Sequence, residues 1–245
     1  MKTFNKMILA SAVTMAVAAP AHALTVDGVT WDPNHPFDFF ATTGNFVQNF
    51  SGDISTGDLV ISGYGRIDFL NGANQASFCP GCELTFTYDG FTQDPALSPN
   101  AAGEFEFTGG TVNIYVDSPG NFNLTNGATA ADGNLWLALS WHSIFGISPT
   151  IEGALTSLIA TFTQGGATGI GLLDVTGGAA AQYFDTNTRF GGADIEYQNS
   201  FTAGSGYRLG SGNFFSDTQV PEPASLALLG IGLLGLSAIR SRKVQ

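Results

Sequence analysis

Basic residues are almost absent from the middle of this 245-residue chain. No lysine lies between Lys6 and Lys243. The only basic side chains of residues 24–219 are three arginines, Arg66, Arg189 and Arg208. Against 19 acidic residues they leave this segment with a formal charge of −16. Such a surface repels phosphates and anionic headgroups, which excludes nucleic acid as a partner, and it favours solubility.

Recognisable catalytic signatures are also missing. The chain has no G-x-S-x-G elbow, and beyond residue 23 only His35 and His142 remain, too few histidines for a zinc site. We expect His142, next to Trp141, to lie at the end of a strand; its pairing with a serine nucleophile stays open. Carboxylates are so numerous that no glycosidase pair can be chosen. These absences favour a non-enzymatic protein without a cofactor or metal ion.

The segment DTNTRFGGADIE at 185–196 matches a calcium loop only in part. Asp185, Asn187 and Glu196 take its first, third and twelfth positions, but Arg189 and Phe190 stand where a ligand and a glycine are required. The segment is therefore not predicted to be an EF-hand. Calcium sites of other kinds between β-loops stay open.

The two cysteines form the tetrapeptide CPGC at 79–82. In an oxidising compartment we expect Cys79 and Cys82 to form a disulfide around a type II turn. So short a loop stabilises a fold by only about 2 kcal/mol. The alternative is a thioredoxin-like redox centre, which needs its second cysteine to begin a helix. An alternating strand pattern follows Cys82, so the sequence favours the structural bridge.

Short alternating segments separated by turns dominate residues 24–219, and the whole chain contains 32 glycines. EFEFTGGTVNIYVD at 104–117 predicts a hairpin that turns at Gly109-Gly110. Further strands are predicted in CELTFTYDGF (82–91), DLVISGYGRIDFL (58–70), NLWLALSWHS (134–143), LIATFTQ (158–164) and ADIEYQNSFT (193–202), and one short helix in GGAAAQYFD (177–185). The pattern predicts an all-β fold, a single β-sandwich or jelly-roll-like domain over 24–219. No fixed period is visible, which disfavours a propeller or solenoid.

The N-terminal 23 residues have the features of a signal peptide. A basic start is followed by an apolar stretch and by the small residues Ala21 and Ala23. We therefore expect export through the Sec route and cleavage by signal peptidase after Ala23.

The C-terminus predicts one transmembrane helix at about 224–239. These residues carry no charge and span roughly 24 Å as a helix, which is short for a bilayer unless the flanking basic residues snorkel. The basic stub 240–243, with Arg240, Arg242 and Lys243, predicts a stop-transfer signal on the cytoplasmic side of the inner membrane. The alternative, a buried helix, normally keeps a polar stripe that this segment lacks.

Pro221, Glu222 and Pro223 directly precede that apolar segment. The order of motif, helix and basic cluster over 220–245 resembles the PEP-CTERM sorting domain of Gram-negative bacteria that make exopolysaccharide. The resemblance implies that an exosortase, a membrane-embedded cysteine transpeptidase-like enzyme, reads Pro-Glu-Pro and that the protein then reaches the cell surface or the extracellular matrix. The two prolines favour an extended backbone just outside the membrane, and proline also starts helices well.

Two classes of function follow from these features. The first is a non-enzymatic surface or matrix protein that acts in adhesion or associates with exopolysaccharide in a biofilm. The second is a secreted glycan-active hydrolase whose active-site residues are scattered over loops. A glycan-binding protein should expose Trp or Tyr rings as a platform, whereas an enzyme should have a deep cleft with two convergent polar side chains.

Overall fold

The computed structural model describes residues 23–36, 38–96, 98–99, 104–143, 158–163, 166–202 and 208–220. These residues are mostly strands, with four short helical elements. The all-β class is therefore confirmed. The helices are α2 (Gln75–Phe78), η1 (Gly127–Ala130), α3 (Ala181–Phe184) and η2 (Phe190–Gly192). Of these, α3 is the short helix predicted within 177–185.

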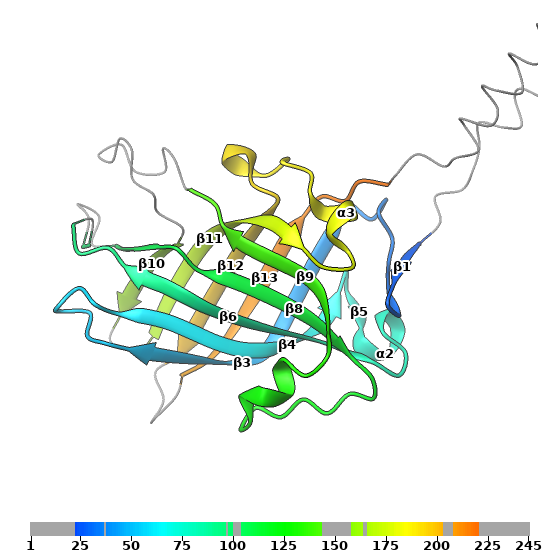
Figure 1. The fold of residues 1–245 in the computed structure, drawn as a ribbon, viewed down its shortest axis with the longest axis horizontal. Coiled ribbons are helices and arrows are strands. Elements are labelled where there is room, and N and C mark those ends of the chain that lie inside the picture. The colour runs from blue at the N-terminus through cyan, green and yellow to red at the C-terminus, as the bar shows by residue number, and fades with distance from the viewer. Residues whose placement is uncertain are drawn as a thin grey trace, which may run out of the picture.

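Eight strands close into an antiparallel barrel (Figure 1). In order around the barrel they are β3 (Phe39–Ser51), β4 (Val60–Leu70), β6 (Glu83–Gln93), β8 (Thr111–Asp117), β9 (Asn134–Trp141), β11 (Gly166–Gly177), β12 (Ile195–Thr202) and β13 (Arg208–Ser216). The last strand pairs back on the first, with Ser216 opposite Phe39 and Arg208 opposite Gln48. The expected sandwich or jelly roll is thus corrected, because one sheet closes on itself and its two edges pair with each other.

The hairpin predicted at 104–117 is also corrected. β7 (Phe105–Thr108) and β8 follow one another along the same edge of β6, with Thr108 opposite Thr92 and Thr111 opposite Asp89. The register is unchanged across Gly109-Gly110, so the two glycines interrupt one strand rather than reverse it. Both have positive φ, 69° and 102°, which only glycine adopts readily and which bends the strand locally.

The inward-facing side chains fill the barrel. Along β4, buried and half-buried residues alternate from Val60 to Asp68, so one face of the strand lines the interior. Phe86 packs edge-on against Phe46 and Phe214, with ring centroids 6.0 and 5.6 Å apart. An eight-stranded barrel is just narrow enough for such filling. A small cavity of about 10 Å³ lies beside Tyr197 and Asn199.

A hairpin of β1 (Leu24–Val26) and β2 (Val29–Trp31) packs with α3 at one end of the barrel. Trp31 lies against Trp136 and Phe184, with centroids 5.7 and 5.4 Å away, and Trp136 Nε1 donates to the Val26 carbonyl at 3.2 Å. The short strand β5 (Ala73–Asn74) and α2 lie at the same end. The last described residues also lie at this end, where the Gln219 N–H donates to the Tyr183 carbonyl in α3.

Candidate functional site

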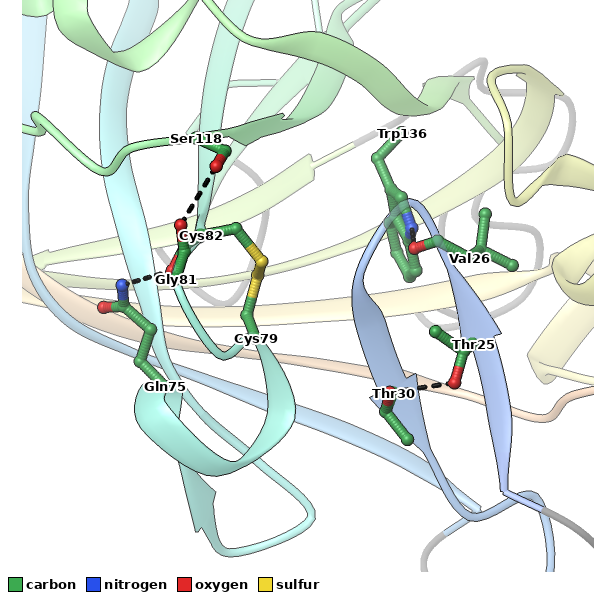
Figure 2. Close-up of a disulfide and its surroundings, with 9 residues drawn as sticks. All are labelled: Thr25, Val26, Thr30, Gln75, Cys79, Gly81, Cys82, Ser118 and Trp136. Atoms are coloured by element: carbon green, nitrogen blue, oxygen red, sulfur yellow. Dashed lines mark hydrogen bonds between the residues drawn. A yellow bond between two sulfur atoms is a disulfide. The ribbon is translucent and has the colours of Figure 1, made fainter.

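Cys79 and Cys82 are joined by a disulfide, with their Cα atoms 5.2 Å apart (Figure 2). Cys79 follows the last residue of α2 and Cys82 directly precedes β6. The turn is held further because Gln75 Nε2 donates to the Cys82 carbonyl at 2.8 Å and Ser118 Oγ donates to the Gly81 carbonyl at 3.0 Å. Since a strand and not a helix begins after Cys82, the arrangement is that of a structural bridge rather than a thioredoxin-like centre.

His142 lies just beyond the end of β9 and links three elements. Its Nδ1 is 2.8 Å and 2.9 Å from the two carboxylate oxygens of Asp174 on β11, and its Nε2 is 3.2 Å from the carbonyl oxygen of Gly191 in η2. Both neighbours are hydrogen-bond acceptors. The nitrogen that would activate a serine therefore faces a carbonyl oxygen, which gives the pair a structural rather than a nucleophile-activating geometry.

The segment with partial calcium-loop spacing is organised by a different residue. Asp185 and Asn187 contact each other, with Asn187 Nδ2 donating to Asp185 Oδ1 at 3.3 Å, while Glu196 lies on β12. The central carboxylate is Asp194, which is 2% exposed. It accepts three backbone N–H groups at 2.6–2.8 Å, those of Val175, Thr186 and Asn187. Within the described ranges, no group of three His, Cys, Asp or Glu side chains is placed to hold a metal ion.

The strongest candidate site is a surface cleft of about 460 Å³, which we call the Arg66 cleft. One wall comes from strands β3 and β4, and the other from the loop between β8 and η1. Its lining residues are mostly polar: Asn45, Arg66, Asp68, Asn121, Phe122, Asn123 and Leu124. Its size lies in the range of small-ligand sites.

A β-bulge shapes the strand wall of the cleft. Thr43 lies opposite Ile67 and Phe46 opposite Gly65, so Gly44 and Asn45 form an irregular step in the ladder. Asn45 is exposed there. A Cβ at position 44 would come within 1.9 Å of Asp68 Oδ2, so the glycine leaves room for this position of the Asp68 carboxylate. The bulge thus brings the carboxylate of Asp68 against the backbone beside Asn45.

Arg66 connects the two walls of the cleft. Its Nε donates to Asp68 Oδ1 at 2.8 Å, its Nη1 lies 3.9 Å from Glu83 Oε2, and its guanidinium carbon lies 5.9 Å from the ring centroid of Phe122. The Arg66 side chain is 37% exposed. Because two carboxylates face this cation, the cleft carries no net positive charge.

Glu83 holds in place the loop between β8 and η1, which forms the second wall of the cleft. This side chain is 2% exposed, and its Oε1 accepts the backbone N–H groups of Asn121 and Phe122, both at 2.6 Å. Tyr64 adds a second attachment by donating its hydroxyl to the Leu124 carbonyl at 2.9 Å. The loop is therefore pinned on the outside of β4 and β6, and the cleft is preformed. Sequence patterns do not distinguish Glu83 from the exposed carboxylates, so this role was not predicted.

The exposed large apolar side chains do not form an aromatic platform. They are Phe69, Leu135, Phe190, Leu209 and Val220. Trp31 and Trp136 are buried in the barrel end. On the described surface, none of the large exposed apolar residues is a Trp or Tyr, so the platform expected of a flat glycan-binding face is not found there.

The targeting residues lie at or beyond the edges of the described chain. Ala23 is exposed directly before β1, whereas Ala21, the Pro221–Pro223 motif, the predicted helix 224–239 and the basic stub with Arg240, Arg242 and Lys243 fall outside the described residues. No helix among the residues that are described is long and apolar enough to cross a bilayer.

Comparison with known proteins adds one match. Residues 219–243 match the PEP-CTERM protein-sorting motif, which confirms the sorting signal expected from the sequence. The motif implies export with a membrane-anchored sorting tail and processing by an exosortase. No curated protein and no solved structure matches the chain.

Proposed function

We propose that this chain is a non-enzymatic exported protein of the cell surface or extracellular matrix, whose barrel binds a neutral glycan in the Arg66 cleft. After export, an exosortase processes the tail at Pro221–Pro223 and frees the protein from the inner membrane. The barrel then associates with exopolysaccharide, in adhesion or in a biofilm matrix. The observation that carries the binding role is the preformed polar cleft. Binding there rests on hydrogen bonds to sugar hydroxyls, in place of the Trp or Tyr platform that the described surface does not show.

The cleft offers the groups that recognise sugar hydroxyls. Asn45, the Oδ1 of Asn121 and the Nδ2 of Asn123 have no partner among the described residues, and they supply both donors and acceptors. Asp68 Oδ2 and the distal nitrogens of Arg66 add charged partners for hydroxyl groups. A vicinal pair of hydroxyls both donates and accepts, so a saccharide can satisfy this mixed set.

Charge favours a neutral over an acidic saccharide. The exported segment carries −16 overall, and Asp68 and Glu83 balance the one arginine of the cleft. A polyuronate would therefore meet repulsion on approach without a compensating cation in the cleft.

The hydrolase alternative has weaker support. A glycosidase needs two carboxyl groups facing each other across the bond that is cut. Asp68 is the carboxylate that lines the described cleft, while Glu83 is buried and already accepts two backbone N–H groups. This arrangement is suited to binding rather than to acid–base chemistry.

Binding is tested with purified mature protein on an array of neutral and uronate-containing polysaccharides. Asn45→Ala removes an exposed amide with no partner in the protein, so we expect normal stability and at least a fivefold loss of affinity for a neutral glycan. Asn49→Ala, also exposed on β3 but outside the cleft, is the matched control and should bind like the wild type. Absence of binding to every polysaccharide, or equal binding by both variants, would contradict the proposal.

A further inference from the structure

The chain remains attached to the barrel up to the first residue of the sorting motif match. Thr218 donates its backbone N–H to Asp38 Oδ2 at 2.6 Å, and its hydroxyl donates to Asp38 Oδ1. The backbone N–H of Gln219 donates to the Tyr183 carbonyl at 2.8 Å. We call the contacts of residues 217–219 with Asp38, α3 and Arg189 the C-terminal clamp.

Further contacts come from side chains. Gln219 Nε2 donates to the carbonyls of Gln182 and Asp185 at 3.0 and 2.9 Å, and Arg189 Nη2 lies 3.2 Å from Asp217 Oδ1. Each of residues 217, 218 and 219 therefore has its own attachment. The partners come from the residue before β3, from α3 and the residue after it, and from the residue before η2. The clamp therefore depends on the folded barrel.

The clamp is prepared by a second set of contacts. Asp38 has positive φ, 51°, and its carbonyl accepts a hydrogen bond from Asn71 Nδ2 at 2.7 Å. Asn71 Oδ1 in turn accepts the N–H of Phe40 at 2.8 Å. These contacts fix the backbone on both sides of Asp38 and hold its carboxylate toward Thr218.

The clamp lies next to the Pro-Glu-Pro motif that the exosortase is expected to read. Val220 is the single residue between Gln219 and Pro221, and two residues of extended chain reach at most about 7 Å. An enzyme that binds its substrate as an extended peptide uses the backbone groups around its motif. Here the N–H groups of Thr218 and Gln219 are already occupied by the barrel.

We propose that the C-terminal clamp restrains processing, so that residues 217–219 must detach from the barrel before the exosortase can act on the Pro-Glu-Pro motif. The inference rests on the processing step of the proposed function and adds its regulation by the folded domain. Local detachment of a chain end costs less free energy than global unfolding, so the clamp sets the rate of processing without requiring the barrel to unfold.

The test follows loss of the C-terminal stub in a host that carries the enzyme, by pulse-chase with an antibody against residues 240–245. Asp38→Asn keeps a residue that tolerates positive φ but weakens the charged acceptor, and we expect processing to accelerate on the order of tenfold. Insertion of Gly-Ser-Gly-Ser after Val220 moves the motif away from an intact clamp and should accelerate processing as well. Asp32→Asn, an exposed turn carboxylate that accepts the Asn34 N–H, is the matched control and should leave the rate unchanged.

Amide hydrogen exchange of the full-length variants measures the clamp itself. Asp38→Asn should speed exchange at Thr218 and Gln219 while the amides of β3 and β13 stay protected. If exchange at Thr218 and Gln219 were unchanged in Asp38→Asn, Asp38 would not hold these residues. If exchange were faster but processing were unchanged or slower, the proposal that the clamp restrains processing would be overturned. Normal processing of Glu222→Ala protein would instead contradict recognition of the Pro-Glu-Pro motif by the exosortase. That result is distinguishable from the two outcomes above.

Discussion

At the end of the barrel that carries the clamp, we expect the free energy of unfolding to depend more on the carboxylate of Asp194 than on any other single group. One of its oxygens accepts the N–H groups of Thr186 and Asn187, and the other accepts that of Val175. Asp194→Asn preserves the shape but leaves one acceptor oxygen. Whichever way the new amide is turned, its NH₂ group faces a buried backbone N–H.

The expected loss of stability follows from this arrangement. A hydrogen bond to a charged group contributes about 1.5–3 kcal/mol, and a buried N–H left without an acceptor costs about 1–3 kcal/mol. We therefore expect unfolding free energy to fall by about 3–5 kcal/mol. For a domain of this size, each kcal/mol lowers Tm by about 2–4 °C, so Tm should fall by at least about 6 °C.

Thermal and denaturant unfolding followed by circular dichroism provide the assay. Asp185→Asn is the control, because Asp185 is exposed and its side-chain carboxylate accepts a hydrogen bond from the Asn187 side-chain amide at 3.3 Å; its effect should stay within about 0.5 kcal/mol. If Asp194→Asn were no more destabilising than this control, the role of the buried carboxylate in the loop would be refuted.

Three further predictions concern the mature N-terminus, the disulfide and two buried tyrosines. Mass spectrometry of the mature protein should find Leu24 at its N-terminus, and an uncleaved N-terminus would contradict the signal peptide. Replacing Cys79 and Cys82 together by serine should lower stability by about 2 kcal/mol or less, and thiol labelling of the unreduced protein should detect nothing, whereas free thiols would contradict the bridge. Burial raises the pKa of both Tyr88 and Tyr197 above the usual 10.0. The unfolded protein therefore loses these protons more easily, and stability should fall as pH rises above about 10. Spectroscopic titration of the folded protein checks this, and reversible ionisation of every tyrosine with a midpoint near pH 10 would refute it.

The strands could be predicted from the sequence because alternation reports which face of a strand is buried. The segments at 58–70, 82–91, 134–143, 158–164 and 193–202 all contain strands. Closure could not be predicted, since it depends on pairing β13 with β3 across the whole chain, and local patterns carry no information about that register. A sandwich and a barrel therefore give the same alternation.

The Gly109-Gly110 prediction was wrong for a related reason. Two glycines between alternating segments favour a turn, but they also permit a bend within one strand. The neighbouring strand decides between a turn and a bend. Here β7 and β8 both pair with the same edge of β6, so the glycines form a bend.

The candidate site was mostly beyond sequence reasoning. Arg66 was visible as one of three arginines in the exported segment, yet the loop that it contacts lies more than 50 residues further along the chain. Glu83 and Asp194 were indistinguishable from the other carboxylates, since only folding shows which of them lie beneath a loop. The sorting motif, in contrast, was readable, because its features are adjacent in the sequence.

The most direct test of the account is the fate of the C-terminal stub in wild-type and Glu222→Ala protein, expressed in a host that carries the exosortase. One interfacial carboxylate contributes little to the insertion of the sixteen uncharged residues 224–239, so an ordinary anchor would not respond to the change. We predict that fractionation with an antibody against residues 240–245 finds wild-type protein released without its stub, and Glu222→Ala protein retained in the inner membrane with the stub intact. Equal retention of the stub in both proteins would contradict the account and reduce the tail to a permanent anchor.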